Sequence, residues 1–161
     1  MLKKYSTNFS NAFTIAADLH KDHRGYFRTT YNKDAYATIG VTDNFIQDNV
    51  SYSKYNVLRG MHIDYRTPKL VLCLQGEILD VIVNMDTFEW QSFTLSENRL
   101  QLYVPAGFAH GFLVTSKEAI VSYKVCANYD PKAELHLKWN DEHIIKAWPE
   151  NLHPILSLKD S

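Results

Sequence analysis

The stretch KLVLCLQGEILDVIVN, residues 69–84, contains two short apolar runs, 69–74 and 77–84, separated by Gln75-Gly76. Apolar runs of this length that end at turn residues predict β-strands, and a two-residue separation predicts that the two strands pair as a hairpin. Asp80 is the one acid in the otherwise apolar stretch of residues 79–83. The simpler interpretation, which we favour at this point, places its carboxylate on the outer face of the sheet, in solvent.

The same pattern of short runs bounded by turn residues continues along most of the chain, and it predicts an all-β protein of antiparallel strands closed into a sandwich or small barrel. No linker or repeat divides the sequence, so residues 1–161 are interpreted as one domain. Short peripheral helices are expected at residues 33–39 and 141–148. The further predicted strands span residues 45–51, 56–63, 90–95, 100–104, 111–115, 119–127 and 135–139.

Charge and composition restrict the classes of partner. The 17 basic and 18 acidic side chains give a net charge of −1, which provides no general attraction to nucleic acid or to an anionic membrane. No apolar run approaches the roughly 20 residues of a membrane-spanning helix, and the first residues lack the apolar stretch of a signal peptide. We therefore expect a cytoplasmic protein with a small-molecule partner. Cys73 and Cys126 lie in apolar segments and are interpreted as buried thiols.

Two clusters of polar residues carry candidate chemistry. The first, RGMHID at residues 59–64, brings Arg59 and His62 close to Lys69 if their two strands pair, as we predict. Strand alternation puts Arg59 and His62 on opposite faces unless a bulge intervenes. The second, VPAGFAHGF at residues 104–112, sets His110 at a bend among small and aromatic residues. A single histidine is most simply a hydrogen-bonded core residue, but two such clusters in one small barrel indicate a site.

Taken together, these and other motifs closely resemble the dTDP-4-dehydrorhamnose 3,5-epimerase family. The resemblance runs from Asp22 to Asp160 and rests on the motifs RGMH (59–62), PKLV (68–71), QGEILDVIV (75–83), LQLYVPAGFAHGF (100–112), SYK (122–124), NYD (128–130), KWND (138–141) and PILSLKD (154–160). It implies a cupin-type antiparallel barrel, or jelly roll, that forms a homodimer and needs no metal or other cofactor. It also implies epimerisation at C3 and/or C5 of a nucleotide-linked 4-keto-6-deoxyhexose in deoxysugar and polysaccharide biosynthesis.

The resemblance also implies roles for individual residues. Matched by position, His62 is the general base, Asp160 orients it, Tyr123 is the proton donor on the opposite face of the sugar, and Lys69 lies near the developing enolate oxygen. The matched substrate-binding residues are Arg24, Phe27, Gln47, Asn49, Arg59, His110 and Tyr129, of which Arg24 and Phe27 act partly across the dimer. Thr29 replaces an acidic residue that the family often uses to recognise thymine, so the sequence leaves the nucleotide open.

These residue types suit the chemistry. Removing a proton next to a ketone needs a base that is neutral near pH 7, and the reference pKa of histidine, about 6.5, fits that task. A carboxylate behind the imidazole fixes its tautomer, and an ammonium stabilises the enolate.

Three alternatives to this function stay open. A ketoisomerase or monoepimerase of the same fold would use a similar base. A metal-dependent cupin oxygenase would use His62, Asp64 and His110 as ligands, although the positive charge of Lys69 opposes a cation there. The third alternative is a binding protein that has lost catalysis.

Overall fold

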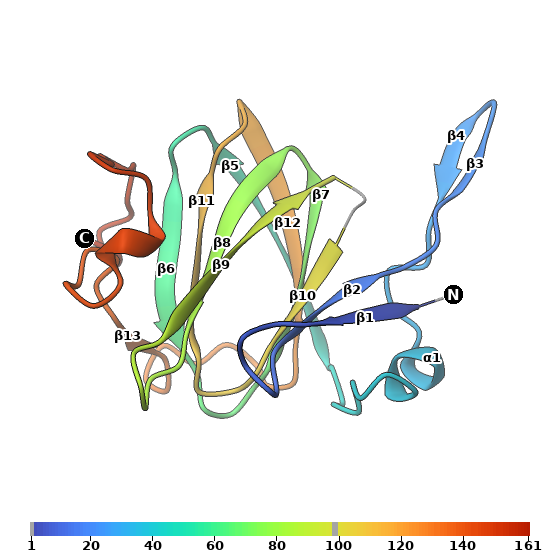
Figure 1. The fold of residues 1–161 in the computed structure, drawn as a ribbon, viewed down its shortest axis with the longest axis horizontal. Coiled ribbons are helices and arrows are strands. Elements are labelled where there is room, and N and C mark those ends of the chain that lie inside the picture. The colour runs from blue at the N-terminus through green and yellow to red at the C-terminus, as the bar shows by residue number, and fades with distance from the viewer. Residues whose placement is uncertain (1, 98–99) are drawn as a thin grey trace.

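Two antiparallel sheets face each other in the computed structural model, which describes residues 2–97 and 100–161 (Figure 1). The six-stranded sheet has the order β1 (Lys3–Ser6), β2 (Phe13–Ala16), β10 (Leu100–Val104), β7 (Lys69–Gln75), β12 (Glu118–Val125) and β5 (Gln47–Lys54). The five-stranded sheet has the order β13 (Leu135–His136), β6 (Leu58–Ile63), β11 (Ala109–Val114), β8 (Glu77–Val83) and β9 (Trp90–Ser96). The predicted all-β, jelly-roll architecture is confirmed.

The predicted hairpin at Gln75-Gly76 is wrong. Strands β7 and β8 belong to different sheets, and the chain crosses from one sheet to the other at this turn. Likewise β6, which carries Arg59 and His62, does not pair with β7, which begins at Lys69. Each sheet needs the other to cover its apolar face, so consecutive runs pack face to face instead of side by side.

The parts of the chain before β5 and after β12 were predicted less well. Strands β1, β2, β3 (His20–Asp22) and β4 (Gly25–Phe27) have no counterpart in the prediction. All four are only three or four residues long, and all but β2 are also exposed and lack an apolar alternation. Helix α1 (Lys33–Ala37) confirms the first predicted helix, with the Asn32 side chain accepting a hydrogen bond from the Ala35 amide. The predicted helix at 141–148 is wrong: turns and a short 3₁₀ segment, η1 (Ile145–Ala147), occupy it. The strand predicted at 135–139 ends at His136.

The core lies between the sheets. Val71 and Val121 of one sheet pack with Ile78 and Phe112 of the other, and all four are buried. A second apolar cluster, which includes Leu58 and Trp148, joins the five-stranded sheet to the C-terminal segment. No helix in the described residues is long and apolar enough to cross a membrane. A cavity borders this core, and Phe112 and Val121 belong to both the core and the cavity lining.

A bulge in β6 determines which side chains reach that cavity. His62 lies opposite His110 and Arg59 lies opposite Phe112, so three steps along β6 match two along β11. The extra residue shifts the alternation, and Arg59 and His62 both line the cavity. The backbones approach closely there, because a Cβ atom on Gly60 would lie 2.5 Å from the Gly111 Cα atom.

We expect Gly60→Ala to destabilise the protein by about 1–3 kcal/mol, as overpacking in a fixed backbone does. The added carbon would meet backbone atoms of Gly111 and His110, and neither strand can withdraw without losing its ladder. Gly25→Ala is the matched control: its φ of +127° resembles the +131° of Gly60, but nothing lies within 4 Å of the new carbon. Urea unfolding measures both variants, and equal losses would refute a role for the close approach of β6 and β11.

Candidate active site

A cavity of about 240 Å³ opens between the two sheets, next to the C-terminal segment. All four residues with implied catalytic roles line it, and they come from both sheets and from the end of the chain. Arg59 and His110 also line it, and the remaining lining residues are Ser51, Phe112, Val121, Ser157 and Lys159.

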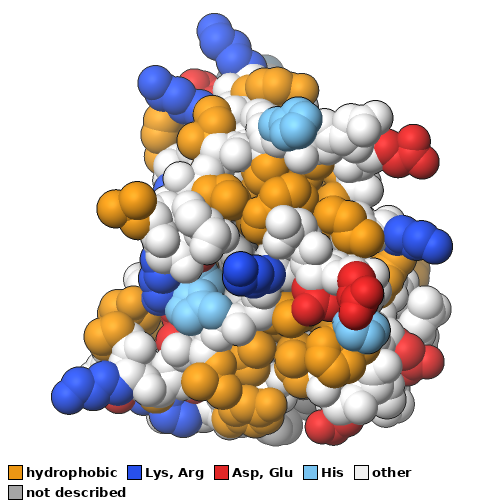
Figure 2. Space-filling model, turned by 90° about the vertical axis from the view of Figure 1, so that its left-hand side faces the viewer, with side chains coloured by type: hydrophobic (Ala, Val, Ile, Leu, Met, Phe, Trp, Pro, Cys, Tyr) orange, Lys and Arg blue, Asp and Glu red, His pale blue; other side chains and the backbone are white. Residues whose placement is uncertain are grey.

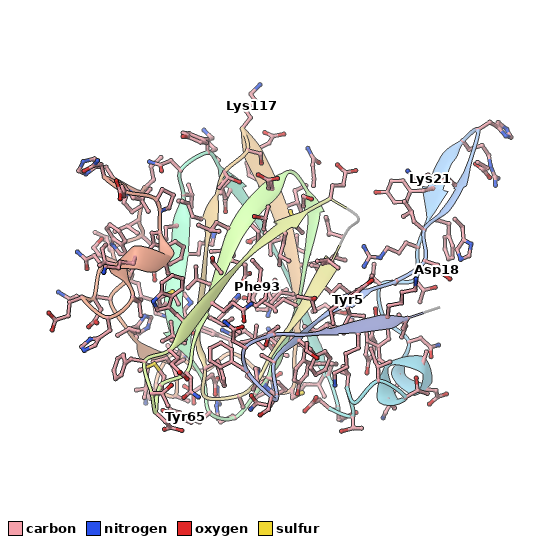
Figure 3. All side chains as sticks on the ribbon, viewed as in Figure 1. Tyr5, Asp18, Lys21, Tyr65, Phe93 and Lys117 are labelled. Atoms are coloured by element: carbon pink, nitrogen blue, oxygen red, sulfur yellow. The ribbon has the colours of Figure 1, made fainter. Side chains whose placement is uncertain are left out.

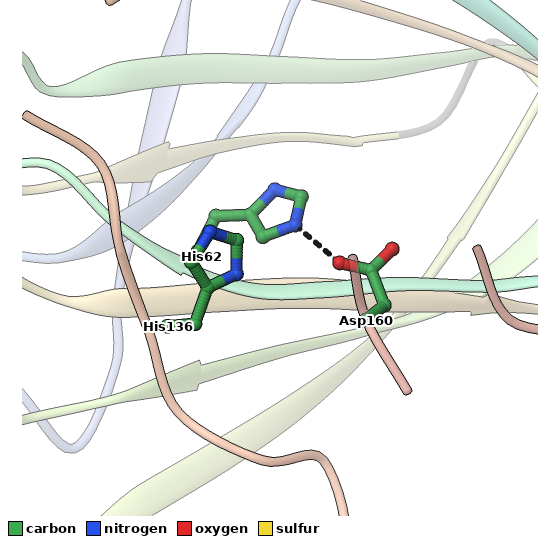
Figure 4. Close-up of side chains that lie close together, drawn as sticks. All are labelled: His62, His136 and Asp160. Atoms are coloured by element: carbon green, nitrogen blue, oxygen red, sulfur yellow. Dashed lines mark hydrogen bonds and ion pairs between the residues drawn. The ribbon is translucent and has the colours of Figure 1, made fainter. Parts of the chain in front are cut away.

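His62 and Asp160 form a close pair although 98 residues separate them in the chain (Figure 4). The His62 Nε2 atom lies 2.7 Å from the Asp160 Oδ1 atom, and the Asp160 side chain is only 6% exposed. The Ser157 hydroxyl donates to the other carboxylate oxygen at 2.9 Å. A carboxylate at Nε2 favours the tautomer with a proton on that nitrogen, which leaves the lone pair on Nδ1.

The surroundings keep the imidazole neutral. Burial lowers the pKa of His62 below its ordinary value of 6.5, and the nearby Lys69 ammonium lowers it further, while the Asp160 and Glu134 carboxylates act in the opposite direction. The free base is therefore the prevailing form at pH 7.

The proton donor and the cation lie on the opposite wall. Tyr123 of β12 is paired with Val71, two residues from Lys69 on β7, so their side chains lie on the same face of the six-stranded sheet. Burial raises the pKa of Tyr123, so its phenol holds its proton at neutral pH. Burial lowers the pKa of Lys69, and the Glu134, Asp80 and Asp64 carboxylates oppose that effect. The imidazole and the phenol thus face the cavity from different sheets.

The placement of Asp80 corrects the prediction that it faces solvent. Its side chain is fully buried, and both carboxylate oxygens lie 3.0 Å from the His110 Nε2 atom. Asp80 is paired with Phe112 of β11, two residues from His110, and both of these residues line the cavity, so Asp80 shares the inner face of the sheet with them. His110 provides the hydrogen-bond partner that a buried carboxylate requires. The pair holds His110 at the cavity wall.

The residues with implied substrate-binding roles lie in different parts of the structure. Arg59 lies in the cavity wall, where its Nε atom donates to the Ser53 hydroxyl at 2.9 Å. Gln47 and Asn49 are hydrogen-bonded to each other on β5 but do not line the cavity. Tyr129 is 61% exposed, and its hydroxyl accepts a hydrogen bond from Lys159 at 3.0 Å.

Arg24 and Phe27 lie far from the cavity within one chain. They belong to the β3–β4 hairpin, which projects from the barrel at the end opposite the C-terminal segment (Figures 1 and 3; Lys21 marks the hairpin in Figure 3). Phe27 is 69% exposed, and Arg24 is bound to Asp22 at 2.6 Å.

Sequence reasoning missed several polar residues at the site. Lys159 forms an ion pair with Glu134, whose carboxylate also lies 3.9 Å from the His62 Nδ1 atom. Lys159 and Ser157 lie one and three residues before Asp160, so they belong to the recognised motif PILSLKD and could have been found from it. Glu134 and Ser51 stand in stretches without any distinguishing pattern. The Ser51 hydroxyl is buried and has no hydrogen-bond partner in the described structure.

The three ligands of the alternative metal site do not come together. The Asp64 carboxylate is bound by Arg66 at 2.7 Å and 3.0 Å, and His110 is paired with Asp80. The face that carries the C-terminal segment mixes acidic, basic and hydrophobic side chains (Figure 2).

A jelly-roll barrel whose cavity places an imidazole–carboxylate pair opposite a phenol and an ammonium defines an enzyme that moves protons on a small polar substrate. The family model for dTDP-4-dehydrorhamnose 3,5-epimerase matches residues 6–161, so the chain belongs to that family and is an isomerase.

Individual relatives agree with this assignment. The dTDP-4-dehydrorhamnose 3,5-epimerase of Salmonella typhimurium is 43% identical, with 100% of this chain and 93% of that protein covered. The crystal structure of the Bacillus anthracis enzyme, with TDP and pyrophosphate bound, has a TM-score of 0.93 at 40% identity and covers 99% and 97% of the two chains. The Legionella pneumophila enzyme in complex with dTDP-4-keto-L-rhamnose has a TM-score of 0.92 at 34% identity, with 99% and 90% covered.

Proposed function

We propose that this chain inverts C3 and/or C5 of a nucleotide-linked 4-keto-6-deoxyhexose, with His62 as the base and Tyr123 as the acid. The observation that carries the assignment of roles is their position: the two side chains line one cavity from different sheets, with Lys69 beside the phenol. A base and an acid on opposite walls suit inversion, because the new proton must arrive on the face opposite the one that was lost.

The reaction begins when the Nδ1 lone pair of His62 takes the proton next to the C4 ketone. Asp160 stabilises the imidazolium that forms, and its own hydrogen bond from Ser157 holds it in place. The electron pair of the broken C–H bond moves onto the ketone oxygen as an enolate. The Lys69 ammonium stabilises that charge, by about 2.7–4 kcal/mol on the scale of oxyanion-hole donors. The enolate carbon then takes the phenolic proton of Tyr123.

The cations around the cavity, and the ligands bound in structures of relatives, indicate which substrate this chain binds. Arg59 is suited to the diphosphate because a guanidinium binds phosphate oxygens in pairs. The relatives hold TDP or a dTDP-linked sugar, and we assign a dTDP-sugar to this chain as well. We place Arg24 and Phe27 at the nucleotide of a second copy in a homodimer, because Tyr26 and Phe27 of the hairpin are 49% and 69% exposed. Such a reaction serves deoxysugar biosynthesis in the cytoplasm.

Hydrogen exchange from heavy water tests the proposal. The protein is incubated with 4-keto-6-deoxyhexoses linked to dTDP, CDP, UDP or GDP, and deuterium at C3 and C5 is followed by NMR. We expect incorporation at one or both carbons of the dTDP-linked sugar. Incorporation at a single carbon would identify a monoepimerase, and a folded protein that exchanges neither carbon of any substrate would overturn the proposed function.

A further inference from the structure

The proposed base belongs to a group of three side chains that could bind a metal ion. The ligand atoms of His62, His136 and Asp160 are all within 4.8 Å of one another (Figure 4). His136 lies directly opposite His62 in the pairing of β13 with β6. The two rings pack edge to face, with their centroids 4.9 Å apart. We propose that a divalent transition-metal ion, with Zn²⁺ as the reference ion, binds these three residues and inhibits the enzyme. The inhibition rests on the proposed function, whereas the binding does not.

The donor set suits such an ion. Histidine nitrogens and carboxylate oxygens are ordinary zinc ligands, and two histidines with one carboxylate form a common three-residue set that leaves a position open for water. Zinc–ligand bonds of about 2.0–2.2 Å place two ligands at most about 4.4 Å apart, so small side-chain rotations bring the three residues together. The side chain of His136 is 32% exposed, so an ion reaches the group from solvent.

The local charges permit a cation. The Glu134 carboxylate lies 3.9 Å from the His62 Nδ1 atom and 3.7 Å from the His136 Nε2 atom, and together with Asp160 it supplies two negative charges. Lys159 and Lys69 supply two positive charges, of which Lys159 is already paired with Glu134. The histidines therefore face no excess of positive charge, although Lys69 alone would repel an ion.

Binding would disable the base through its tautomer. The His62 Nε2 atom points to Asp160, so an ion shared with Asp160 takes that nitrogen. A neutral imidazole carries one proton, which must then sit on Nδ1, where the catalytic lone pair had been. The ring can no longer accept a proton from the substrate.

Metal binding is measured first, without substrate. Chelator-treated protein is titrated with Zn²⁺ by calorimetry and with Co²⁺ by visible absorption, which reports on the ligands. We expect one ion per chain, with affinity falling at lower pH as the histidines are protonated. His136→Gln should weaken binding by more than the roughly 10–100-fold that loss of an outer-shell partner costs. The matched control is His143→Gln, which removes another exposed histidine beside a carboxylate, Asp141, at 2.8 Å, and should leave the affinity unchanged.

The second readout is exchange activity with and without Zn²⁺. We expect Zn²⁺ to inhibit the wild type and His143→Gln but not His136→Gln, which keeps its metal-free activity. No binding to the wild type, or equal binding and inhibition in His136→Gln, would overturn the site. Metal binding that depends on His136 in a protein that exchanges no substrate would overturn the proposed function and leave the site standing.

Discussion

Replacing His62 with alanine lowers the rate of substrate hydrogen exchange by at least about 10²–10⁴-fold, the usual contribution of a positioned base. The other imidazole that lines the cavity does not take over, because His110 is held by Asp80 at 3.0 Å and lies in a different strand of the cavity wall. Deuterium incorporation from heavy water, at a saturating concentration of the dTDP-linked sugar, measures the loss.

Two further variants make this result specific. Asp160→Asn retains the shape of the side chain but removes the charge that stabilises the imidazolium, so exchange falls while thermal stability changes little. Tyr123→Phe removes the proton donor but leaves the base, so inversion is lost to a greater degree than exchange with solvent. The side chain of His62 is 26% exposed and is not part of the core, so His62→Ala folds normally. Undiminished exchange in folded His62→Ala would place the base elsewhere.

Replacing Asp80 with alanine lowers the free energy of unfolding by about 1–3 kcal/mol, the range for leaving a buried hydrogen-bonding group without its partner. The cost arises because Asp80 is fully buried and both of its oxygens contact His110, which remains buried and unpaired in the variant. Urea unfolding measures the change. Asp80→Asn keeps an acceptor oxygen for His110 and should lose less.

The exposed pair of Asp141 and His143 provides the control. Its atoms lie 2.8 Å apart, as close as those of the buried pair, but 54% of the His143 side chain and 31% of the Asp141 side chain are exposed. Exposed pairs contribute less than about 1 kcal/mol, so Asp141→Ala should change stability little. Equal losses in Asp80→Ala and Asp141→Ala would show that burial of Asp80 contributes nothing.

The position of the strands was predictable because it depends on local pattern. The runs at 69–74 and 100–104 appear as β7 and β10 within one residue of their predicted limits, since a half-buried strand requires apolar residues at its own positions. The pairing of strands was not predictable in the same way. The hairpin expected at Gln75-Gly76 failed because a turn that joins two strands in one sheet and a turn that crosses between sheets need the same residues.

The candidate site also has one part that the sequence predicted and one part that it did not. The residue types were recognisable from motifs, and the family resemblance named Asp160 as the partner of His62 across 98 residues of chain. Strand alternation, in contrast, separated Arg59 from His62 and put Asp80 in solvent. The bulge against β11 and the neighbouring His110 reverse both assignments, and neither feature can be read from the residues concerned.

By itself, the sequence determined the all-β class, the strand segments from β5 to β12 and the chemical groups available, because apolar periodicity and residue type belong to the chain. Only the tertiary structure decided which strands share a sheet, that Asp80 is buried against His110, and that Glu134 and His136 lie beside His62. These facts depend on contacts between distant segments, and such contacts form only where packing brings two surfaces together.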